Sequence, residues 1–336
     1  MVGVILATAG YDHTIRLWEA ATGMCCRTIQ FKDSQVNALA VTPDRNLLAA
    51  AGYNTVRLFD LNNKNASHVA QFDGHTANIT SLGFSSDGKW MYTSSEDKTI
   101  RLWDMRAKSL SREFHHRGAV NSVALHPNER EFFAGDQMGE VRVWDIGKEA
   151  CSHELIPDGE VAIRSVAINP DGTMAVAANN KGMCFVWLWT TELKDLTEGS
   201  DVEEEEDGVE KHSHSDGSEL LEEVSLLTPR YKLDAHQNYI LKTVFSPDGR
   251  FLATTSADKT VALWDVASDF GIFKTLEGHQ RWVWDCSFSA DSAYVVTASS
   301  DGTAQLWDVN SGESIKTYNG HDKPIVAVCL EDTTDT

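Results

Sequence analysis

Three groups of histidine, serine and aspartate residues contain the side chains from which a hydrolase builds a catalytic triad. Each group is followed by a tryptophan, and the members are His75, Ser95, Asp97 and Trp103; His236, Ser256, Asp258 and Trp264; and His279, Ser299, Asp301 and Trp307. A serine nucleophile needs an exposed hydroxyl, an oxyanion hole and a single copy. Because this set recurs with the same spacing and ends on tryptophan each time, it favours a repeated, buried polar network. The sequence therefore predicts structural tetrads and no hydrolase.

No other motif supports catalysis, a metal or a cofactor. Asp269-Phe270-Gly271 matches the magnesium-binding signature of protein kinases, but no glycine-rich loop, strand lysine or His-Arg-Asp loop precedes it. The six cysteines include no C-x-x-C pair, which predicts reduced thiols and neither disulfides nor zinc. His212 and His214 could suggest a metal, but two histidines in an acidic stretch are better explained as incidental. We expect a protein that is not an enzyme and uses no cofactor and no metal.

The elements that carry these groups repeat with a period of about 42 residues. Seven short alternating strands end on an aromatic residue, at Trp18, Phe59, Trp103, Trp144, Trp187, Trp264 and Trp307. Turn signals such as Ser86-Asp87-Gly88 separate the strands within a repeat, which predicts an antiparallel meander. The interval from Trp187 to Trp264 is about 35 residues longer than the others, so it contains an insertion.

This arrangement resembles the WD-repeat family, whose members are β-propellers with four-stranded blades. The resemblance implies an all-β fold, a seven-bladed WD-repeat β-propeller that forms a single domain over residues 1–336. It also implies that the histidine, serine, aspartate and tryptophan of each tetrad hydrogen-bond to one another inside a blade. The strand at 4–9 has no Gly-His pair before it, and the strand at 325–330 has no tryptophan after it. We predict that these N- and C-terminal strands pair in one blade and close the ring.

The inserted segment, residues 192–223, contains 14 acidic residues and two lysines. Its composition predicts a disordered, solvated loop between the fifth and sixth blades. Ser200, with Asp201 and Glu203 after it, leaves an acidophilic phosphorylation site as an alternative. The whole chain has a formal charge of −21, so we expect no nucleic-acid partner. No apolar run approaches the roughly 20 residues of a membrane-spanning helix, which predicts no direct membrane insertion.

The innermost strand of each predicted blade should place two residues at one rim of the central channel, because side chains alternate along a strand. These pairs are Gln35 and Asn37, Asn78 and Thr80, Ala119 and Asn121, Ala162 and Arg164, Tyr239 and Leu241, Trp282 and Trp284, and Pro324 and Val326. The last three pairs form an apolar, aromatic-rich arc of the kind found at protein interfaces. The alternative is that these rings pack between blades. The predicted partner-binding residues are Gln35, Asn37, Tyr239, Leu241, Trp282 and Trp284.

Several stretches are similar to a narrower family, the G-protein-β-like (lethal with Sec-thirteen) subunits of target of rapamycin (TOR) kinase complexes. They include Gly135-Asp136-Gln137, Leu155-Ile156-Pro157 and Arg281-Trp282-Val283-Trp284, and the resemblance runs from Val4 to about Val328. It implies a non-catalytic scaffold subunit that binds the catalytic domain of a TOR-type kinase through Gln35, Trp282 and Trp284. Such a subunit would stabilise the kinase, assist substrate access and meet other TOR complex subunits through the kinase. The expected location is cytoplasmic, with peripheral association with endolysosomal or vacuolar membranes through the kinase complex.

Two other functions remain open. A WD-repeat substrate receptor of a ubiquitin ligase, or an adaptor that reads a modified peptide, would favour a basic or caged central pocket. Among the rim residues only Arg164 is basic, which disfavours that function. A hydrolytic or lyase propeller would need acidic or histidine side chains that converge on the channel, and the rim pairs contain none.

Overall fold

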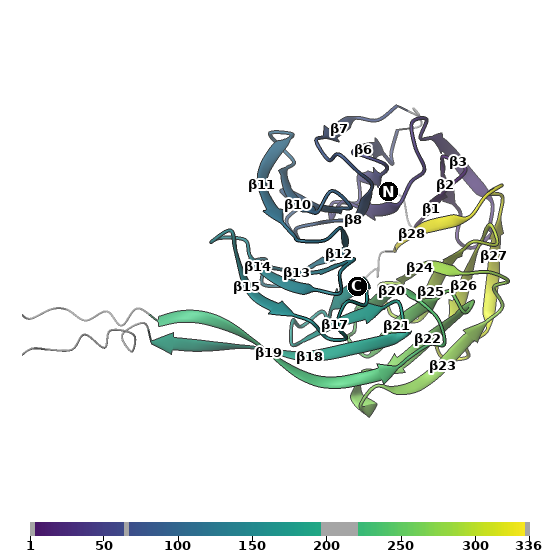
Figure 1. Cartoon of the computed structure of the whole chain (residues 1–336). Helices are drawn as coiled ribbons and strands as arrows, with labels where there is room; N and C mark the ends of the chain where they lie inside the picture. The colour runs from purple at the N-terminus through teal and green to yellow at the C-terminus, as the bar shows by residue number, and fades with distance from the viewer. Residues whose placement is uncertain (1–3, 64–66, 196–220, 333–336) are drawn as a thin grey trace, which may run out of the picture.

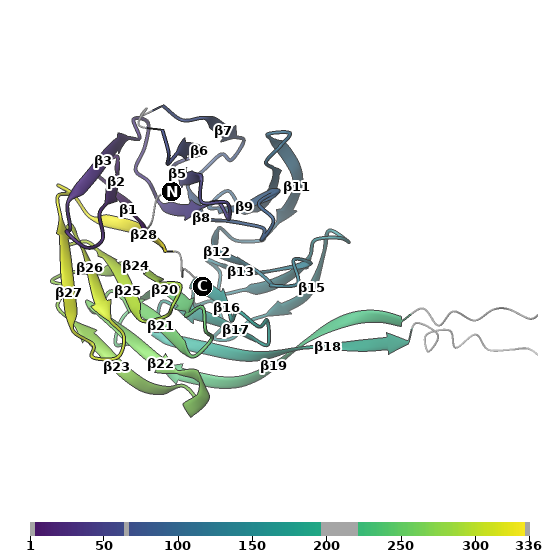
Figure 2. The ribbon, with the colours of Figure 1, turned by 180° about the vertical axis from the view of Figure 1, so that it is seen from behind.

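Seven four-stranded antiparallel sheets surround a central axis in the computed structural model (Figure 1), which describes residues 4–63, 67–195 and 221–332. The view from behind shows the same ring of blades (Figure 2). Among the described residues the one helical segment is a single 3-10 turn, η1 (Val266–Ser268). The predicted all-β, seven-bladed propeller is confirmed.

The first three blades contain twelve strands. Blade 1 consists of β28 (Ile325–Glu331), β1 (Ile5–Gly10), β2 (Thr14–Trp18) and β3 (Cys25–Gln30). Blade 2 consists of β4 (Ala38–Val41), β5 (Leu47–Ala51), β6 (Thr55–Asp60) and β7 (Ala70–Asp73). Blade 3 consists of β8 (Ile79–Phe84), β9 (Trp90–Ser95), β10 (Thr99–Asp104) and β11 (Ser109–His115).

The other four blades follow in chain order. Blade 4 consists of β12 (Val120–Leu125), β13 (Glu131–Asp136), β14 (Val141–Asp145) and β15 (Ala150–Leu155). Blade 5 consists of β16 (Ile163–Ile168), β17 (Met174–Asn179), β18 (Met183–Asp195) and β19 (Leu221–Asp234). Blade 6 consists of β20 (Ile240–Phe245), β21 (Phe251–Ser256), β22 (Thr260–Asp265) and β23 (Gly271–Glu277). Blade 7 consists of β24 (Val283–Phe288), β25 (Tyr294–Ser299), β26 (Thr303–Asp308) and β27 (Ser314–Asn319).

Aspartate turns join the strands within a blade. Between β8 and β9, the Asp87 carboxylate accepts the Ser85 hydroxyl at 2.8 Å and the Lys89 backbone N–H at 2.9 Å. Gly88 in this turn has a φ of 67°, a left-handed conformation that glycine adopts without a steric penalty. These turns reverse the chain within a few residues, so neighbouring strands in sequence are also neighbours in the sheet.

The two ends of the chain complete blade 1. β1 pairs with β28 in antiparallel register, with Leu6 opposite Leu330 and Thr8 opposite Val328. The predicted closure of the ring by the terminal strands is therefore confirmed. Because β28 pairs with β1, blade 1 has four strands like the other blades, and β1 is not left as an edge strand.

The hydrophobic core of the described residues is divided into seven clusters, each between two neighbouring blades. The cluster between blades 2 and 3, for example, packs Ala49 and Val56 against Ile79, Met91 and Trp103. Each aromatic residue that ends a repeat lies in a different cluster, namely Trp18, Phe59, Trp103, Trp144, Trp187, Trp264 and Trp307. A blade thus buries its apolar faces only against its two neighbours, so the ring has to close to cover the first and last blades.

Blade 5 differs from the others because β18 and β19 continue as a long ribbon beyond the ring (Figure 1). Their backbones pair as far as Asp195 opposite Leu221. The prediction that all of 192–223 is a disordered loop was therefore wrong at both ends, because this ladder satisfies the backbone hydrogen bonds of the flanking residues. Residues 196–220, which include Ser200, His212 and His214, lie outside the described residues.

The base of this ribbon packs against blade 4. The buried Trp189 ring lies 4.6 Å from the His126 ring and 5.8 Å from the Phe133 ring, measured between centroids. The Ser225 hydroxyl donates to the Glu131 carboxylate at 2.8 Å. The extra length of β18 and β19 is thus held to the neighbouring blade by apolar and polar contacts.

Candidate functional site

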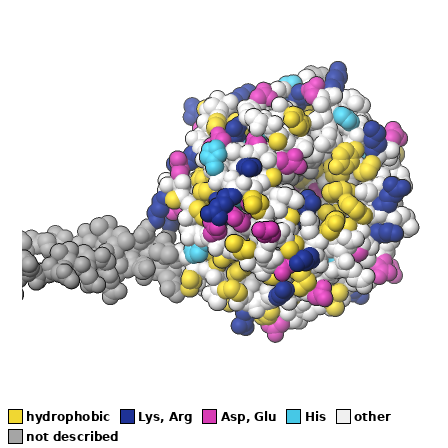
Figure 3. Space-filling model, viewed as in Figure 1, with side chains coloured by type: hydrophobic (Ala, Val, Ile, Leu, Met, Phe, Trp, Pro, Cys, Tyr) yellow, Lys and Arg dark blue, Asp and Glu magenta, His cyan; other side chains and the backbone are white. Residues whose placement is uncertain are grey.

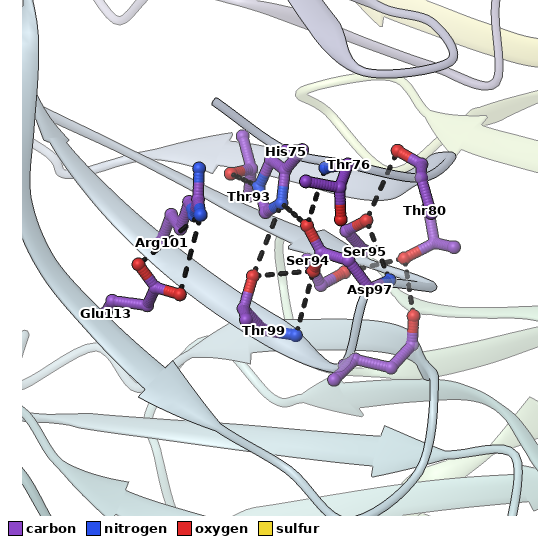
Figure 4. Close-up of polar contacts among 12 residues, drawn as sticks. His75, Thr76, Thr80, Thr93, Ser94, Ser95, Asp97, Thr99, Arg101 and Glu113 are labelled. Atoms are coloured by element: carbon purple, nitrogen blue, oxygen red, sulfur yellow. Dashed lines mark hydrogen bonds and ion pairs between the residues drawn. The ribbon is translucent and has the colours of Figure 1, made fainter. Parts of the chain in front are cut away.

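The predicted tetrads are buried hydrogen-bonded networks. In blade 3, Nδ1 of His75 lies 2.7 Å from Oδ2 of Asp97, and Nε2 lies 2.7 Å from the Thr93 hydroxyl (Figure 4). The indole N–H of Trp103 donates to the same hydroxyl at 2.9 Å. Blades 6 and 7 repeat this network with His236, Asp258, Thr254 and Trp264, and with His279, Asp301, Thr297 and Trp307. The histidine, aspartate and tryptophan of each predicted tetrad thus belong to one hydrogen-bonded network.

The serine members were wrong, because a threonine two positions earlier takes their place in each network. Ser95 instead accepts the backbone N–H of Asp97 at 3.1 Å, and Ser256 and Ser299 do the same in their own turns. Residues 93 and 95 share one face of β9, so strand alternation does not distinguish them. Thr93 lies within the strand beside the indole, whereas Ser95 ends the strand, where the turn needs an acceptor. Threonine and serine both recur in all three repeats, so recurrence did not single out the threonine.

A fourth network, not predicted, joins the two ends of the chain. Nδ1 of His321 lies 2.6 Å from Oδ2 of Asp12, and Nε2 lies 2.8 Å from the Thr8 hydroxyl. The Trp18 indole N–H donates to Thr8 at 2.7 Å. Thr8 and His321 are 313 positions apart in sequence, so these buried contacts lock the closure of the ring.

Blade 4 contains a shorter version of the network. Ala134 lies opposite Arg142, as Thr93 lies opposite Arg101, so the hydroxyl is missing. The Trp144 indole N–H donates directly to Nε2 of His116 at 2.8 Å. Burial lowers the pKa of His116, although the Asp136 carboxylate acts in the opposite direction. A neutral imidazole is required here, because Nε2 has to accept the indole proton.

Thr93→Val should be more destabilising than Ser95→Ala. Valine leaves the buried Trp103 N–H and His75 Nε2 without their shared partner, and we expect a loss of about 3 kcal/mol in the free energy of unfolding. Ser95→Ala removes one turn hydrogen bond and should cost about 1 kcal/mol. Urea unfolding of both variants measures the difference. Equal losses would contradict the assignment of Thr93 as the network hydroxyl.

The network carboxylates should also make the free energy of unfolding depend on pH in the acidic range. Burial alone raises the pKa of Asp12, but hydrogen bonds from His321 and Thr14 and the charge of His321 outweigh it and lower the pKa to about 2. The same balance lowers the pKa of Asp97, Asp258 and Asp301. The pKa of each carboxylate is lower in the folded state than in the unfolded state. The stabilisation from these ionised carboxylates is therefore present above about pH 4 and is lost as the pH falls toward 2.

We therefore expect the urea midpoint to fall most steeply below pH 4. Asp12→Asn should be less stable than the wild type at pH 7, and the gap between the two proteins should narrow as the pH falls from 4 to 2.5. Urea titrations at half-unit intervals test this expectation. A gap that stays constant over that range would mean that Asp12 is not the titrating group.

The predicted rim residues surround the mouth of the central channel. A cavity of about 250 Å³ there is lined by the second residue of every pair, namely Asn37, Thr80, Asn121, Arg164, Leu241, Trp284 and Val326. In six blades this residue is the extra residue of a β-bulge. In blade 7, for example, Val283 lies opposite Ser299 and Asp285 lies opposite Ala298, so Trp284 between them has no partner on β25. A bulge leaves its extra residue out of the ladder and re-aims the side chain. The backbone irregularity therefore directs one side chain per blade into the mouth.

One half of the mouth is held by hydrogen bonds between blades. The Asn37 amide donates to the backbone carbonyls of Ile79 at 3.1 Å and Gly52 at 3.3 Å. The Thr80 hydroxyl and the Asn121 amide donate to the first residue of the following blade in the same way, at 2.8 and 2.7 Å. Asn37, predicted to bind a partner, thus uses both of its amide N–H groups inside the protein.

The other half of the mouth is formed by Tyr239, Leu241, Trp282, Trp284 and Val326, which are five of the six residues of the predicted arc and are called the apolar arc from here on. The Trp282 ring lies 6.2 Å from the Tyr239 ring and 5.6 Å from the Trp284 ring. Tyr239 is 41% exposed and Trp282 is 40% exposed. The Trp284 indole N–H donates to the Ser300 hydroxyl at 2.5 Å, which fixes the ring at the cavity wall. These rings therefore face solvent and the channel mouth instead of packing between blades.

Gln35 lies on the opposite flank of the apolar arc from Arg164 and lines the same cavity. Its amide nitrogen lies 3.5 Å from the Asn78 side-chain oxygen, a long contact that leaves hydrogen-bonding capacity for another molecule. Tyr11, 39% exposed, also lines the cavity. The structure therefore brings all six predicted partner-binding residues to one end of the channel.

An ion pair deeper in the channel was missed by sequence reasoning. Nζ of Lys242 lies 3.5 Å from Oδ1 of Asp285, and Oδ2 of Asp285 accepts the Val328 backbone N–H at 2.9 Å. Both charged residues also line a second cavity of about 410 Å³, so the pair lies between the two cavities. Asp285 raises the pKa of Lys242, and burial raises the pKa of Asp285.

Lys242 and Asp285 occupy the same position in their blades, directly after the bulge residue of the innermost strand. Ser81, Ser122 and Ser165 stand there in blades 3, 4 and 5, and each accepts a backbone N–H of the following blade. In the sequence, the polar residues that recur at this position indicate hydrogen bonds or ion pairs between neighbouring blades. The sequence did not show that the two charged ones, in neighbouring blades, pair with each other.

The described residues contain no cluster of three or more histidine, cysteine, aspartate or glutamate side chains that could hold a metal ion. Within the same ranges no helix is long and apolar enough to span a bilayer. On the face seen in Figure 3, basic side chains are interspersed with acidic ones.

The blades, the networks and the closed ring define a WD-repeat propeller. Residues 23–60, 66–104, 108–145, 227–265 and 271–308, together more than half of the chain, match the family described as "WD domain, G-beta repeat". The chain is 49% identical to the target of rapamycin complex subunit wat1 of Schizosaccharomyces pombe, over 98% of this chain and 96% of that protein. It is 46% identical to the target of rapamycin complex subunit LST8 of Saccharomyces cerevisiae, over 98% of this chain and all of that protein. LST8 of Bos taurus is 44% identical, over 98% of this chain and 95% of its own length.

The chain belongs to this family of WD-repeat proteins, the LST8 and wat1 family. The resemblance noted from the short sequence motifs is thereby confirmed. These relatives are named as subunits of a complex, a description that agrees with the predicted absence of catalysis.

Proposed function

We propose that this chain is a non-catalytic scaffold subunit of TOR complexes and binds the catalytic domain of a TOR-type kinase. The names of its relatives support the assignment to TOR complexes. The observation that carries the binding mode is the apolar arc, in which aromatic rings in contact with one another, two of them exposed, adjoin a preformed cavity. Exposed tryptophan and tyrosine side chains of this kind supply much of the binding energy at protein interfaces.

The binding surface consists of Trp282, Trp284, Tyr239 and Leu241 as apolar contacts, with Gln35 as a hydrogen-bonding group. Asn37 lies beside this surface and holds blades 2 and 3 together, because its amide donates to backbone carbonyls of both blades. A rigid closed ring suits a scaffold, since little conformational entropy is lost when a partner docks. Through this contact the propeller stabilises the kinase domain and assists substrate access, and it meets other TOR complex subunits by way of the kinase.

The proposed location is the cytoplasm, including the surface of endolysosomal or vacuolar membranes when the kinase complex is there. In this proposal the chain reaches the membrane through its partner and makes no insertion of its own. Imaging of the tagged chain with and without depletion of the kinase tests this, since membrane signal should disappear with the kinase.

The identity of the partner is tested by affinity purification of the tagged full chain from its native cells in gentle salt. Mass spectrometry should recover a very large TOR-type kinase together with further subunits of the same complex. Recovery of ubiquitin-ligase or chromatin subunits in place of the kinase would overturn the proposal and favour a substrate receptor or peptide-reading adaptor.

A further inference from the structure

Arg164 is the basic residue that borders the apolar arc at the channel mouth. It is the bulge residue of blade 5, and its neighbour in the ring is Leu241 of blade 6. Its Nε–H donates to the Asn180 side-chain oxygen at 2.7 Å, which fixes the direction of the guanidinium. No further hydrogen bond or ion pair joins Arg164 to another described residue, so its other four N–H groups remain for a partner at the cavity that it lines.

The remaining charges around this cavity are already engaged. Lys242 pairs with Asp285, which also accepts two backbone N–H groups, and Glu96 accepts the Asn78 amide at 2.8 Å. Among the described residues that line the cavity, Arg164 is thus the cation without a carboxylate partner. A partner that covers the apolar arc would also remove water from this half-buried guanidinium, which costs free energy unless an anion meets it.

We propose that the segment of the partner that docks on the apolar arc carries an aspartate or glutamate whose carboxylate binds Arg164 at the channel mouth. A guanidinium with two free NH₂ groups matches a carboxylate in a two-point contact. Leu241 and then Trp284 follow Arg164 around the mouth, so the acidic side chain would lie beside apolar residues of the same segment. The inference rests on the proposed function, because it assumes that the arc is the docking surface.

The experiment is a binding titration between the purified full chain and the catalytic domain of the TOR-type kinase from the same organism, by interferometry at low and high NaCl. Arg164→Gln should weaken binding about tenfold, and Arg164→Glu about a hundredfold at low salt, because a buried charge pair is lost or becomes repulsive. The affinity of the wild type should fall more steeply with salt than that of Arg164→Gln. Lys181→Gln, which removes an exposed cation of the same blade, is the control and should bind within about twofold of the wild type.

A second part of the experiment identifies the acidic residue of the kinase that binds Arg164. Proteolysis first identifies the kinase fragment that the propeller protects, and each exposed aspartate or glutamate of that fragment is then changed to lysine. One of these changes should restore binding to Arg164→Glu and weaken binding to the wild type. If the wild type binds and both Arg164 variants bind equally well at both salt concentrations, this inference is overturned while the proposed function stands. If the wild type does not bind the kinase domain at all, the proposed function fails, and this inference fails with it.

Discussion

Replacement of both Trp282 and Trp284 by alanine is expected to abolish capture of the TOR-type kinase while the propeller stays folded. The two rings lie 5.6 Å apart, and the outer one is 40% exposed. Central aromatic side chains of an interface typically contribute about 2 kcal/mol or more each, so the double variant should bind on the order of a thousandfold more weakly. Affinity purification followed by a titration with the kinase domain measures this loss.

Stability should change little in this variant, because neither ring belongs to the clusters between blades that form the core. Tyr294→Ala is the matched control, since this exposed aromatic lies in the same blade at the far end of β25. It should leave kinase capture unchanged. Full capture by the double tryptophan variant, or an equal loss in the Tyr294 control, would show that the apolar arc is not the docking surface.

His321→Ala is expected to open the ring. His321 precedes β28, and its imidazole contacts Asp12 in the turn after β1 at 2.6 Å and Thr8 in β1 at 2.8 Å. Its loss leaves the Asp12 carboxylate with only the hydrogen bonds from Thr14 and the Thr8 hydroxyl with only the Trp18 indole N–H, which should cost about 3 kcal/mol of unfolding free energy. Because β28 then separates from β1 more readily, the exposed strand edge should also promote aggregation.

His236→Ala is the matched control, since it removes the same contacts in blade 6, where the chain continues on both sides. Hydrogen exchange should show fast amides throughout β1 and β28 in His321→Ala, and a change confined to blade 6 in His236→Ala. Equal unfolding free energies with a protected β28 in both variants would mean that the terminal network does not control closure.

The sequence predicted the architecture because each repeat carries its own turn and strand signals. Regular spacing of residues such as Trp103, Trp264 and Trp307 gave the number of blades, and the incomplete first and last repeats predicted the shared blade. Local hydrogen-bonding turns and alternating strands depend on neighbouring residues, so their signals survive in the linear order. The same reasoning found the histidine, aspartate and tryptophan of the networks.

The hydroxyl member of the networks could not be chosen in this way, because Thr93 and Ser95 face the same side of one strand. Their roles differ only in distance from the indole and from the turn, and the packed blade sets both distances. Similarly, nothing in the linear order placed Lys242 beside Asp285, since the two residues come from different blades. Asp12 lies six positions before Trp18, as Asp97 does before Trp103, so the contact with His321 could have been found from the repeat spacing once the shared blade was predicted.

By itself the amino-acid order determined the all-β class, the seven blades, the closing strand and the residue types at one rim. Only the tertiary structure decided which of those residues face a partner. The ring gathers six bulge positions and Asn37 into one mouth, where Asn37, Thr80 and Asn121 bond to the next blade while Trp284 and Arg164 face the cavity. The physical reason is that exposure, pairing and charge balance at this mouth depend on residues that are distant in sequence and meet only when the ring closes.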